Sequence, residues 1–191
     1  MYDYVSSHWS DDETTAVTPF LTYANQIRSV VVENGVTSIG ENAFYGCNRL
    51  TSVSLPDTLY AINSNAFYGC SHLTDIQIPE GTESLNGSAF RNCNALRTLQ
   101  FPASLTNCEN VSYLYACNGL ENFVVDADNP SYASVDGILY NKKKSSLLVV
   151  PSAWNQTVLT VPETVTQIAS EAMDNNQKVQ KVILPAGLTM I

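Results

Sequence analysis

Cysteine is the residue type whose spacing in this sequence comes closest to a chemical pattern. Cys47, Cys70 and Cys93 follow one another at steps of 23 residues, and Cys108 and Cys117 complete the set of five. Such thiols could form disulfides or bind zinc, but no CxxC pair is present and the chain has only two histidines. Because the first three occupy one repeated position beside apolar residues, the sequence favours free, buried thiols that pack as small hydrophobes. A Cys108–Cys117 disulfide and a zinc site are the alternatives.

Two groups of polar residues share some features with a calcium loop and with a catalytic triad. The segment 126–137 holds three aspartates, but it lacks the spacing and the final Glu of an EF-hand, so turn formation is favoured over calcium binding. His72 and Asp75 lie near Ser52 and Ser71, but base and orienting group are only three residues apart, so no triad is indicated. We therefore expect no catalytic residue, no cofactor and no bound metal.

The charge of the chain argues against nucleic acid as a partner. The net charge is −9 with only nine basic residues, whereas phosphate binding needs clustered lysine and arginine. The basic cluster Lys142–Lys144 falls where a solvated turn is expected. No apolar run approaches the roughly 20 residues that cross a bilayer, and residues 1–4 have neither the basic nor the apolar region of a signal peptide. We expect no nucleic-acid partner, no membrane insertion and no signal peptide within this sequence.

A repeat of 23 residues positions all these side chains. The segment Gly40–Cys47 recurs as Asn63–Cys70 and again as Asn86–Cys93, without a gap. The register begins at Ile27 and reappears near the C-terminus, where Ile191 falls at the start of another repeat. One repeat offers too few apolar side chains to offset the conformational entropy of ordering it, so neighbouring repeats must share their apolar layers.

Each repeat predicts a short strand that ends at a proline. In the segment Leu50–Pro56, apolar Val53 and Leu55 alternate with Ser52 and Ser54, and proline, which has no N–H, ends the run. The Ala-Phe segment that follows is expected to form one or two helical turns. Because about 16 residues separate identical strands, neighbouring strands must pair in parallel, which makes the chain a coil of repeats.

The repeat is interrupted between Asp126 and Thr157. This interval is 13 residues longer than the regular spacing allows. It contains two β-type runs, Ser134–Tyr140 and Ser145–Pro151, around the polar turn Asn141–Lys144. We expect a hairpin that projects from the stack or pads its convex side, and insertions of this kind often serve binding.

The first part of the chain does not follow the repeat. Trp9, Phe20 and Tyr23 are expected to cover the first apolar layer, as a cap must. The acidic run Asp11–Glu13 is expected to be solvated.

The pattern predicts a single solenoid domain over residues 1–191, in four parts. A cap over 1–26 precedes regular repeats over 27–126, and a longer repeat with the hairpin follows over 127–157. Further repeats over 158–191 end inside a repeat, so the sequence is expected to be a fragment or to lack a C-terminal cap.

The outward-facing strand residues form the most extended candidate binding surface. At the repeat spacing they make two columns of mostly small polar side chains. The residues expected to contact a partner are Ser52, Asp75, Thr98 and Asn122 in one column, and Ser54, Gln77 and Gln100 in the other. Stacked repeats present such columns as one extended concave wall, which favours ligand contact. Plain solvation is the alternative for any single residue.

The pattern Asn-Ala-Phe-Tyr-Gly-Cys followed by Leu-Thr-x-Val/Ile-x-Leu/Ile-Pro resembles the repeats of the BspA-like leucine-rich-repeat family of bacterial surface proteins. The resemblance runs from Ile27 to Ile191, and the stretch Asn129–Tyr140 is similar to the longer repeat of that family. It implies an α/β solenoid, a curved right-handed superhelix with a parallel β-sheet on its concave face. The sequence departs from the pattern at Ser112–Leu114, which replaces Ala-Phe with one extra residue, and at Asn176, which replaces cysteine.

The resemblance also implies a secreted or cell-surface protein, often one that adheres to host or matrix proteins. We therefore predict a non-enzymatic module that binds a protein through its concave strands and its hairpin. A structural spacer or scaffold within a larger surface protein is the alternative, motivated by the incomplete last repeat.

Overall fold

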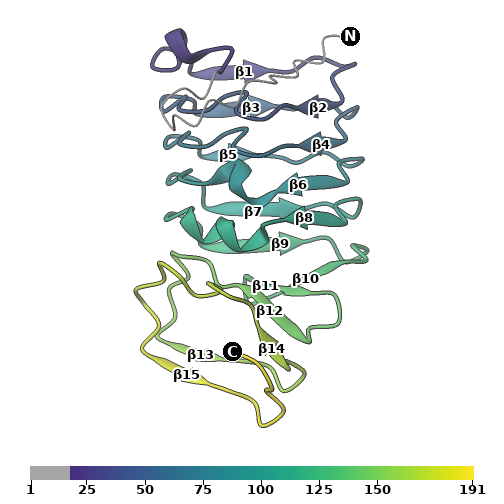
Figure 1. The fold of residues 1–191 in the computed structure, drawn as a ribbon, viewed down its shortest axis with the longest axis vertical. Helices are drawn as coiled ribbons and strands as arrows, with labels where there is room; N and C mark the ends of the chain where they lie inside the picture. The colour runs from purple at the N-terminus through teal and green to yellow at the C-terminus, as the bar shows by residue number, and fades with distance from the viewer. Residues whose placement is uncertain (1–17) are drawn as a thin grey trace, which may run out of the picture.

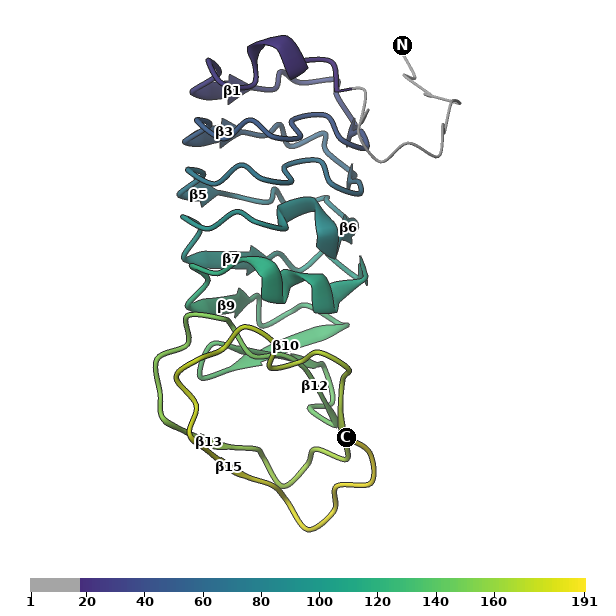
Figure 2. The ribbon, with the colours of Figure 1, turned by 60° about the vertical axis from the view of Figure 1, so that its left-hand side comes forward.

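The computed structural model describes residues 18–191, and over this range the chain winds into a stack of coils (Figure 1). In two views the coils lie one beneath another along the long axis of the molecule (Figure 2). Trp9 and the run Asp11–Glu13 lie outside the described residues, so their expected places in a cap stay predictions. The curvature and right-handedness expected of the stack also stay predictions.

Most coils contribute one strand to a first strand row, which runs along one side of the stack (Figure 2). Its first members, β1 (Ser29–Val31), β3 (Ser52–Ser54) and β5 (Asp75–Ile76), pair in parallel in this order. β7 (Thr98–Phe101) and β9 (Asn122–Val125) form a further parallel pair on the same side. Paired residues of β1, β3 and β5 lie one repeat apart, which confirms the predicted strands and their parallel pairing.

A second strand row runs along another side of the coils. Its members are β2 (Ser38–Ile39), β4 (Ala61–Ile62), β6 (Ser84–Asn86) and β8 (Asn107–Glu109), which pair in parallel in this order. The expectation of a single parallel sheet was therefore incomplete. Each of these strands buries a single residue of the repeat, so no run of alternating apolar residues marks it in the sequence; the buried residues are Ile39, Ile62, Leu85 and Cys108.

The third side of the coils holds turns and short 3-10 helices. These helices are η1 (Leu21–Tyr23), η2 (Gly87–Phe90) and η3 (Val111–Ala116). In the two repeats before η2, the same position is a series of turns in which Asn42 and Asn65 have left-handed backbone angles, with φ of 56° and 54°. Glu171 at the same position of the last repeat is also left-handed, with φ of 61°, and lies in turns. A left-handed residue interrupts a right-handed helix, so the predicted helical turns form only where this position is not left-handed.

A column of stacked phenylalanine rings runs through the core. The rings of Phe44 and Phe67 have centroids 5.3 Å apart, and those of Phe67 and Phe90 lie 5.5 Å apart. Phe20 stacks on Phe44 at 5.4 Å, so it covers the first layer as the sequence predicted. Tyr23 is 58% exposed, and its expected part in the cap was wrong.

The interval predicted as a hairpin forms three antiparallel strands inside the stack. β10 (Tyr132–Val135) pairs with β11 (Ile138–Asn141), which pairs with β12 (Ser146–Val149). β12 also pairs in parallel with β14 (Gln167–Ile168). The hairpin of β11 and β12 is thus a layer of the solenoid, and the expectation that it projects from the stack or pads its surface was wrong.

The physical reason is that both faces of this hairpin are buried. Leu139 and Val149 pack in the hydrophobic cluster of the preceding coils. Ile138, Tyr140 and Leu147 pack in a second hydrophobic cluster, which continues into the following coils. A projecting hairpin would leave one of these apolar faces in water. The hairpin therefore divides the core into two clusters.

The first strand row resumes after the hairpin. β13 (Val158–Thr160) and β15 (Lys181–Ile183) pair in parallel, one repeat apart. β13 is the next strand of the row after β9, but within residues 18–191 no strand pairing joins the two.

Candidate functional site

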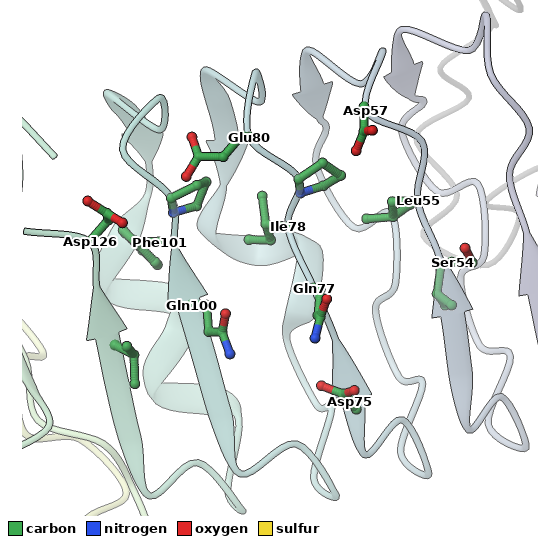
Figure 3. Close-up of a pocket in the computed structure, with 14 residues that line it drawn as sticks. Ser54, Leu55, Asp57, Asp75, Gln77, Ile78, Glu80, Gln100, Phe101 and Asp126 are labelled. Atoms are coloured by element: carbon green, nitrogen blue, oxygen red, sulfur yellow. The ribbon is translucent and has the colours of Figure 1, made fainter. Parts of the chain in front are cut away.

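A groove of about 530 Å³ crosses the first strand row (Figure 3). Its floor is the outward face of β3, β5, β7 and β9, and its border is formed by the turns that follow these strands. The floor side chains come from β3, β5, β7 and β9 and from the residues that follow them, at a step of one coil. The groove therefore spans four coils and belongs to none of them alone.

Four of the seven predicted contact residues line this groove: Ser54, Asp75, Gln77 and Gln100. Gln77 and Gln100 lie next to each other in neighbouring coils, and both are exposed. An amide side chain can donate and accept hydrogen bonds, so this part of the floor can recognise groups of either kind.

The other three predicted residues lie on the same strand row outside the groove lining. Ser52 is exposed in β3. Asn122 donates a hydrogen bond from Nδ2 to Thr98 Oγ1 at 2.9 Å. Because Asn122 and Thr98 use these polar groups on each other, they are less available to a partner than Gln77 and Gln100.

Three carboxylates in the groove border were not among the predicted contacts. Asp57, Glu80 and Asp126 line the groove together with Asp75, and none of the lining residues is basic. Glu80 is held in place because its carboxylate accepts backbone N–H bonds from the next coil at 3.2 and 3.4 Å. Asp57 and Glu80 each follow a repeat proline, 23 residues apart, and this spacing is the signal that could have identified them.

The aspartates between residues 126 and 137 act in turns. Asp126 Oδ1 accepts a hydrogen bond from the backbone N–H of Asp128 at 2.8 Å, as the sequence predicted for a turn-forming residue. Asp136 has a left-handed backbone with φ of 52° in the turn between β10 and β11. Within residues 18–191 there is no group of three or more side chains that could hold a metal ion.

The thiols are buried and free, as predicted, and each of three donates to a phenylalanine carbonyl of the preceding coil. The Sγ atoms of Cys70, Cys93 and Cys117 lie 3.3, 3.2 and 2.8 Å from these oxygens. Cys108 is also free, so the alternative of a Cys108–Cys117 disulfide is not what the structure contains. Burial raises the pKa of the Cys117 thiol to about 12 and raises that of Cys93 well above its usual value. These thiols are packing groups in their neutral form.

His72 and Asp75 do not form part of a triad. His72 Nδ1 makes a hydrogen bond with the carbonyl oxygen of Asn48 and lies 3.3 Å from Ser71 Oγ. Asp75 faces the groove instead. The basic cluster Lys142–Lys144 lies in the turn between β11 and β12, as expected. None of the helices in residues 18–191 has the length and apolar character needed to span a bilayer.

Several solved structures share this architecture. A leucine-rich repeat protein from Eubacterium ventriosum is 25% identical, with a TM-score of 0.73 over 90% of this chain and 51% of its own. The pneumococcal vaccine antigen PcpA is 25% identical, with a TM-score of 0.72 over 84% of this chain and 45% of its own. A leucine-rich repeat protein from Bacteroides ovatus shares the fold at 20% identity, with a TM-score of 0.61 over 98% of this chain and 54% of its own. This chain thus spans about half the length of these structures.

No curated protein matches the sequence. The family described as BspA type leucine rich repeat region matches residues 18–134 and 152–191, in six copies. The interval between these ranges contains β11 and β12, the strands that divide the core. The matched residues make up most of the chain, and the chain therefore belongs to the BspA-type leucine-rich-repeat family.

Proposed function

We propose that this chain is a non-enzymatic protein-binding module of a secreted or cell-surface bacterial protein. The family supports a repeat scaffold of bacterial origin, and the similarity to a pneumococcal vaccine antigen supports exposure at the cell surface. The groove on the first strand row is the contact surface for the partner.

The observation that carries this proposal is the continuity of the groove across four coils. Side chains from β3, β5, β7 and β9 line it, so it extends over about 15 Å if strands lie at their usual spacing. Its floor offers amide groups and its border offers carboxylates, with exposed Val124 adding an apolar contact. An extended polar wall of this kind suits a macromolecular surface better than a small molecule, which binds in enclosed apolar pockets.

The experiment is a binding screen of the purified chain against immobilised matrix proteins and glycans, with two matched pairs of variants. Gln77→Arg with Gln100→Arg places two large cations in the groove floor. Ser38→Arg with Asn107→Arg makes the same charge change at exposed positions of the second strand row. We expect the Gln77→Arg, Gln100→Arg double variant to bind at least ten-fold more weakly than the parent chain. The Ser38→Arg, Asn107→Arg double variant should bind like the parent chain.

Two results would contradict the proposal. Equal affinity of both pairs would mean that the partner binds elsewhere on the coils. Absence of binding to every immobilised protein, with a folded chain, would instead favour the alternative of a structural spacer within a larger surface protein.

A further inference from the structure

Within residues 18–191 no strand pairing joins β5 to β7 or β9 to β13 in the first strand row. Ile76 of β5 and Leu99 of β7 still pack in one hydrophobic cluster, whereas Phe123 of β9 and Leu159 of β13 belong to different clusters. In the regular coils an inner member such as β3 pairs with a strand on each side, whereas β13 pairs with β15 only. The turn between β10 and β11 lies against β9 instead, because the backbone N–H of Phe123 donates to the carbonyl oxygen of Gly137 at 2.8 Å. The turn between β10 and β11 thus bonds to the edge of β9. The facing edge of β13 has no strand partner in the described part of the chain.

The hydrogen bonds of β13 show which of its backbone groups face this open edge. Toward β15, the carbonyl oxygen of Thr157 accepts from Lys181 at 3.1 Å, and the N–H of Val161 donates to Ile183 at 2.9 Å. In a parallel ladder alternate residues bond to the same neighbour, so residues 157, 159 and 161 face β15. The N–H and C=O groups of Val158 and Thr160 consequently point to the other edge.

A slot of about 400 Å³ adjoins this edge. β13 lines one side, and Ile138 and Tyr140 of β11 line the other. Trp154 also lines the slot, and it is fixed by a hydrogen bond from Nε1 to the carbonyl oxygen of Asp136 at 2.8 Å. Buried apolar side chains therefore lie beside unpaired backbone donors and acceptors, the combination that an added strand needs.

We propose that this slot binds an extended peptide segment of a protein partner, which joins the edge of β13 as an additional strand. The pairing of β3 with a strand on each side supports this occupant, because the added segment takes at the open edge of β13 the place that a strand of the neighbouring coil takes beside β3. β13 itself lacks the lysine, proline or bulge that natural proteins use to block an open edge. The segment that fits has apolar residues at alternate positions and contacts Trp154 and Tyr140. This site is separate from the groove of the proposed function.

The probe is a capped synthetic peptide with the sequence of residues 120–127, which contains β9, the strand before β13 in the row. In this peptide the apolar residues corresponding to Phe123 and Val125 stand at alternate positions, which is the pattern expected of a segment that fits the slot. We expect saturable binding below about 1 mM, measured by NMR titration of the ¹⁵N-labelled chain. The amides of Val158 and Thr160 should shift and exchange with deuterium at least ten-fold more slowly, while Gln77 and Gln100 stay unchanged. A scrambled peptide of the same composition should not bind.

Two variants separate the backbone contact from general effects. Thr160→Pro removes an open-edge N–H without touching the groups bonded to β15, and should weaken peptide binding at least ten-fold. Thr160→Ala keeps that N–H and should bind like the parent chain. No saturable binding of the peptide, or binding that leaves the exchange of the Val158 and Thr160 amides unchanged, would overturn the proposal even if Thr160→Pro fails to fold. The arginine pair in the groove leaves this slot intact, so the two proposals can fail independently.

Discussion

Asn129 and Asn176 lie in different coils but make the same four hydrogen bonds. The amide of Asn129 donates to two carbonyl oxygens of the preceding coil at 2.7 and 2.8 Å, and its oxygen accepts two backbone N–H bonds at 2.9 and 2.8 Å. Asn176 repeats this arrangement at 2.9 and 3.1 Å and at 2.9 and 3.0 Å. Asn176, which stands where the repeat has cysteine, therefore ties the last coil to its neighbour.

Replacement of Asn129 by alanine should destabilise the chain by about 2–4 kcal/mol, because it leaves buried backbone groups without partners. Asn129 is fully buried, so water cannot take over these bonds without a change in packing. Urea unfolding followed by circular dichroism measures the loss. Asn155→Ala, at an exposed position, is the control and should change stability by less than about 0.5 kcal/mol. Equal stability of the two variants would show that the four bonds contribute nothing net.

Phe67 is the central ring of the phenylalanine column, and Phe67→Ala should cost about 3–5 kcal/mol. It stacks on a ring in each neighbouring coil and has no exposed surface. Phe20→Ala removes the same side chain at the end of the column, where 38% is exposed, and should cost less than half as much. Denaturant unfolding of both variants under one condition makes the comparison. A larger loss from Phe20→Ala would mean that the end coil, and not the centre of the column, determines stability.

Gly87 marks a place where neighbouring coils approach too closely for any side chain. A Cβ atom there would lie 2.1 Å from the carbonyl oxygen of Asn110. Gly87→Ala should therefore destabilise the chain by about 1–3 kcal/mol through overpacking. Gly40→Ala is the matched control, since a Cβ there meets nothing within 4 Å, and it should stabilise the chain by about 0.4–1 kcal/mol. The prediction is contradicted if the thermal midpoints of both variants move in the same direction.

Alkaline pH should unfold the chain. Burial raises the pKa of Cys117 from 9.0 to about 12 and that of Tyr140 from 10.0 to about 12, because each loses water that would solvate its anion. An acid whose folded pKa is raised contributes stability that is complete below its unfolded pKa and disappears as pH rises to the folded pKa. Unfolding free energy should thus be steady below about pH 9 and fall between about pH 9 and pH 12. Urea titrations across this window test it, and Cys117→Ala should reduce the slope. A flat profile would contradict the burial of these groups.

The regular part of the fold could be predicted from sequence because its signal is repeated. The alternation around Val53 recurs around Ile76 and Leu99, and the spacing of these residues determines the parallel register. The second strand row carries no comparable signal, since a strand such as Ser38–Ile39 holds one buried residue with no apolar residue two positions away. The hairpin was predicted as an element but misplaced. A strand that is apolar on both faces has the same sequence pattern whether its hairpin covers a hydrophobic core or lies between two of them.

The candidate site was predicted only where strand geometry alone determines it. Asp75, Gln77 and Gln100 face the groove because alternate residues of a strand share one face. Asp57 and Glu80 lie in turns, where direction depends on hydrogen bonds to the next coil, such as the bond from the Ala103 N–H to Glu80. The slot beside β13 depends on how far the hairpin separates two coils, which no local pattern encodes.

The hairpin of β11 and β12 also determines how the molecule can come apart. Leu139 completes the first cluster from one face while Tyr140 supports the second from the other. Unfolding of the C-terminal coils therefore exposes one face of this hairpin to water, while the other face still covers the N-terminal coils. We therefore expect the array to unfold as two cooperative units, which hydrogen exchange should resolve as two levels of protection. Because the hairpin separates the two clusters, insertions or deletions of whole coils on one side of it need not change the side-chain packing on the other side.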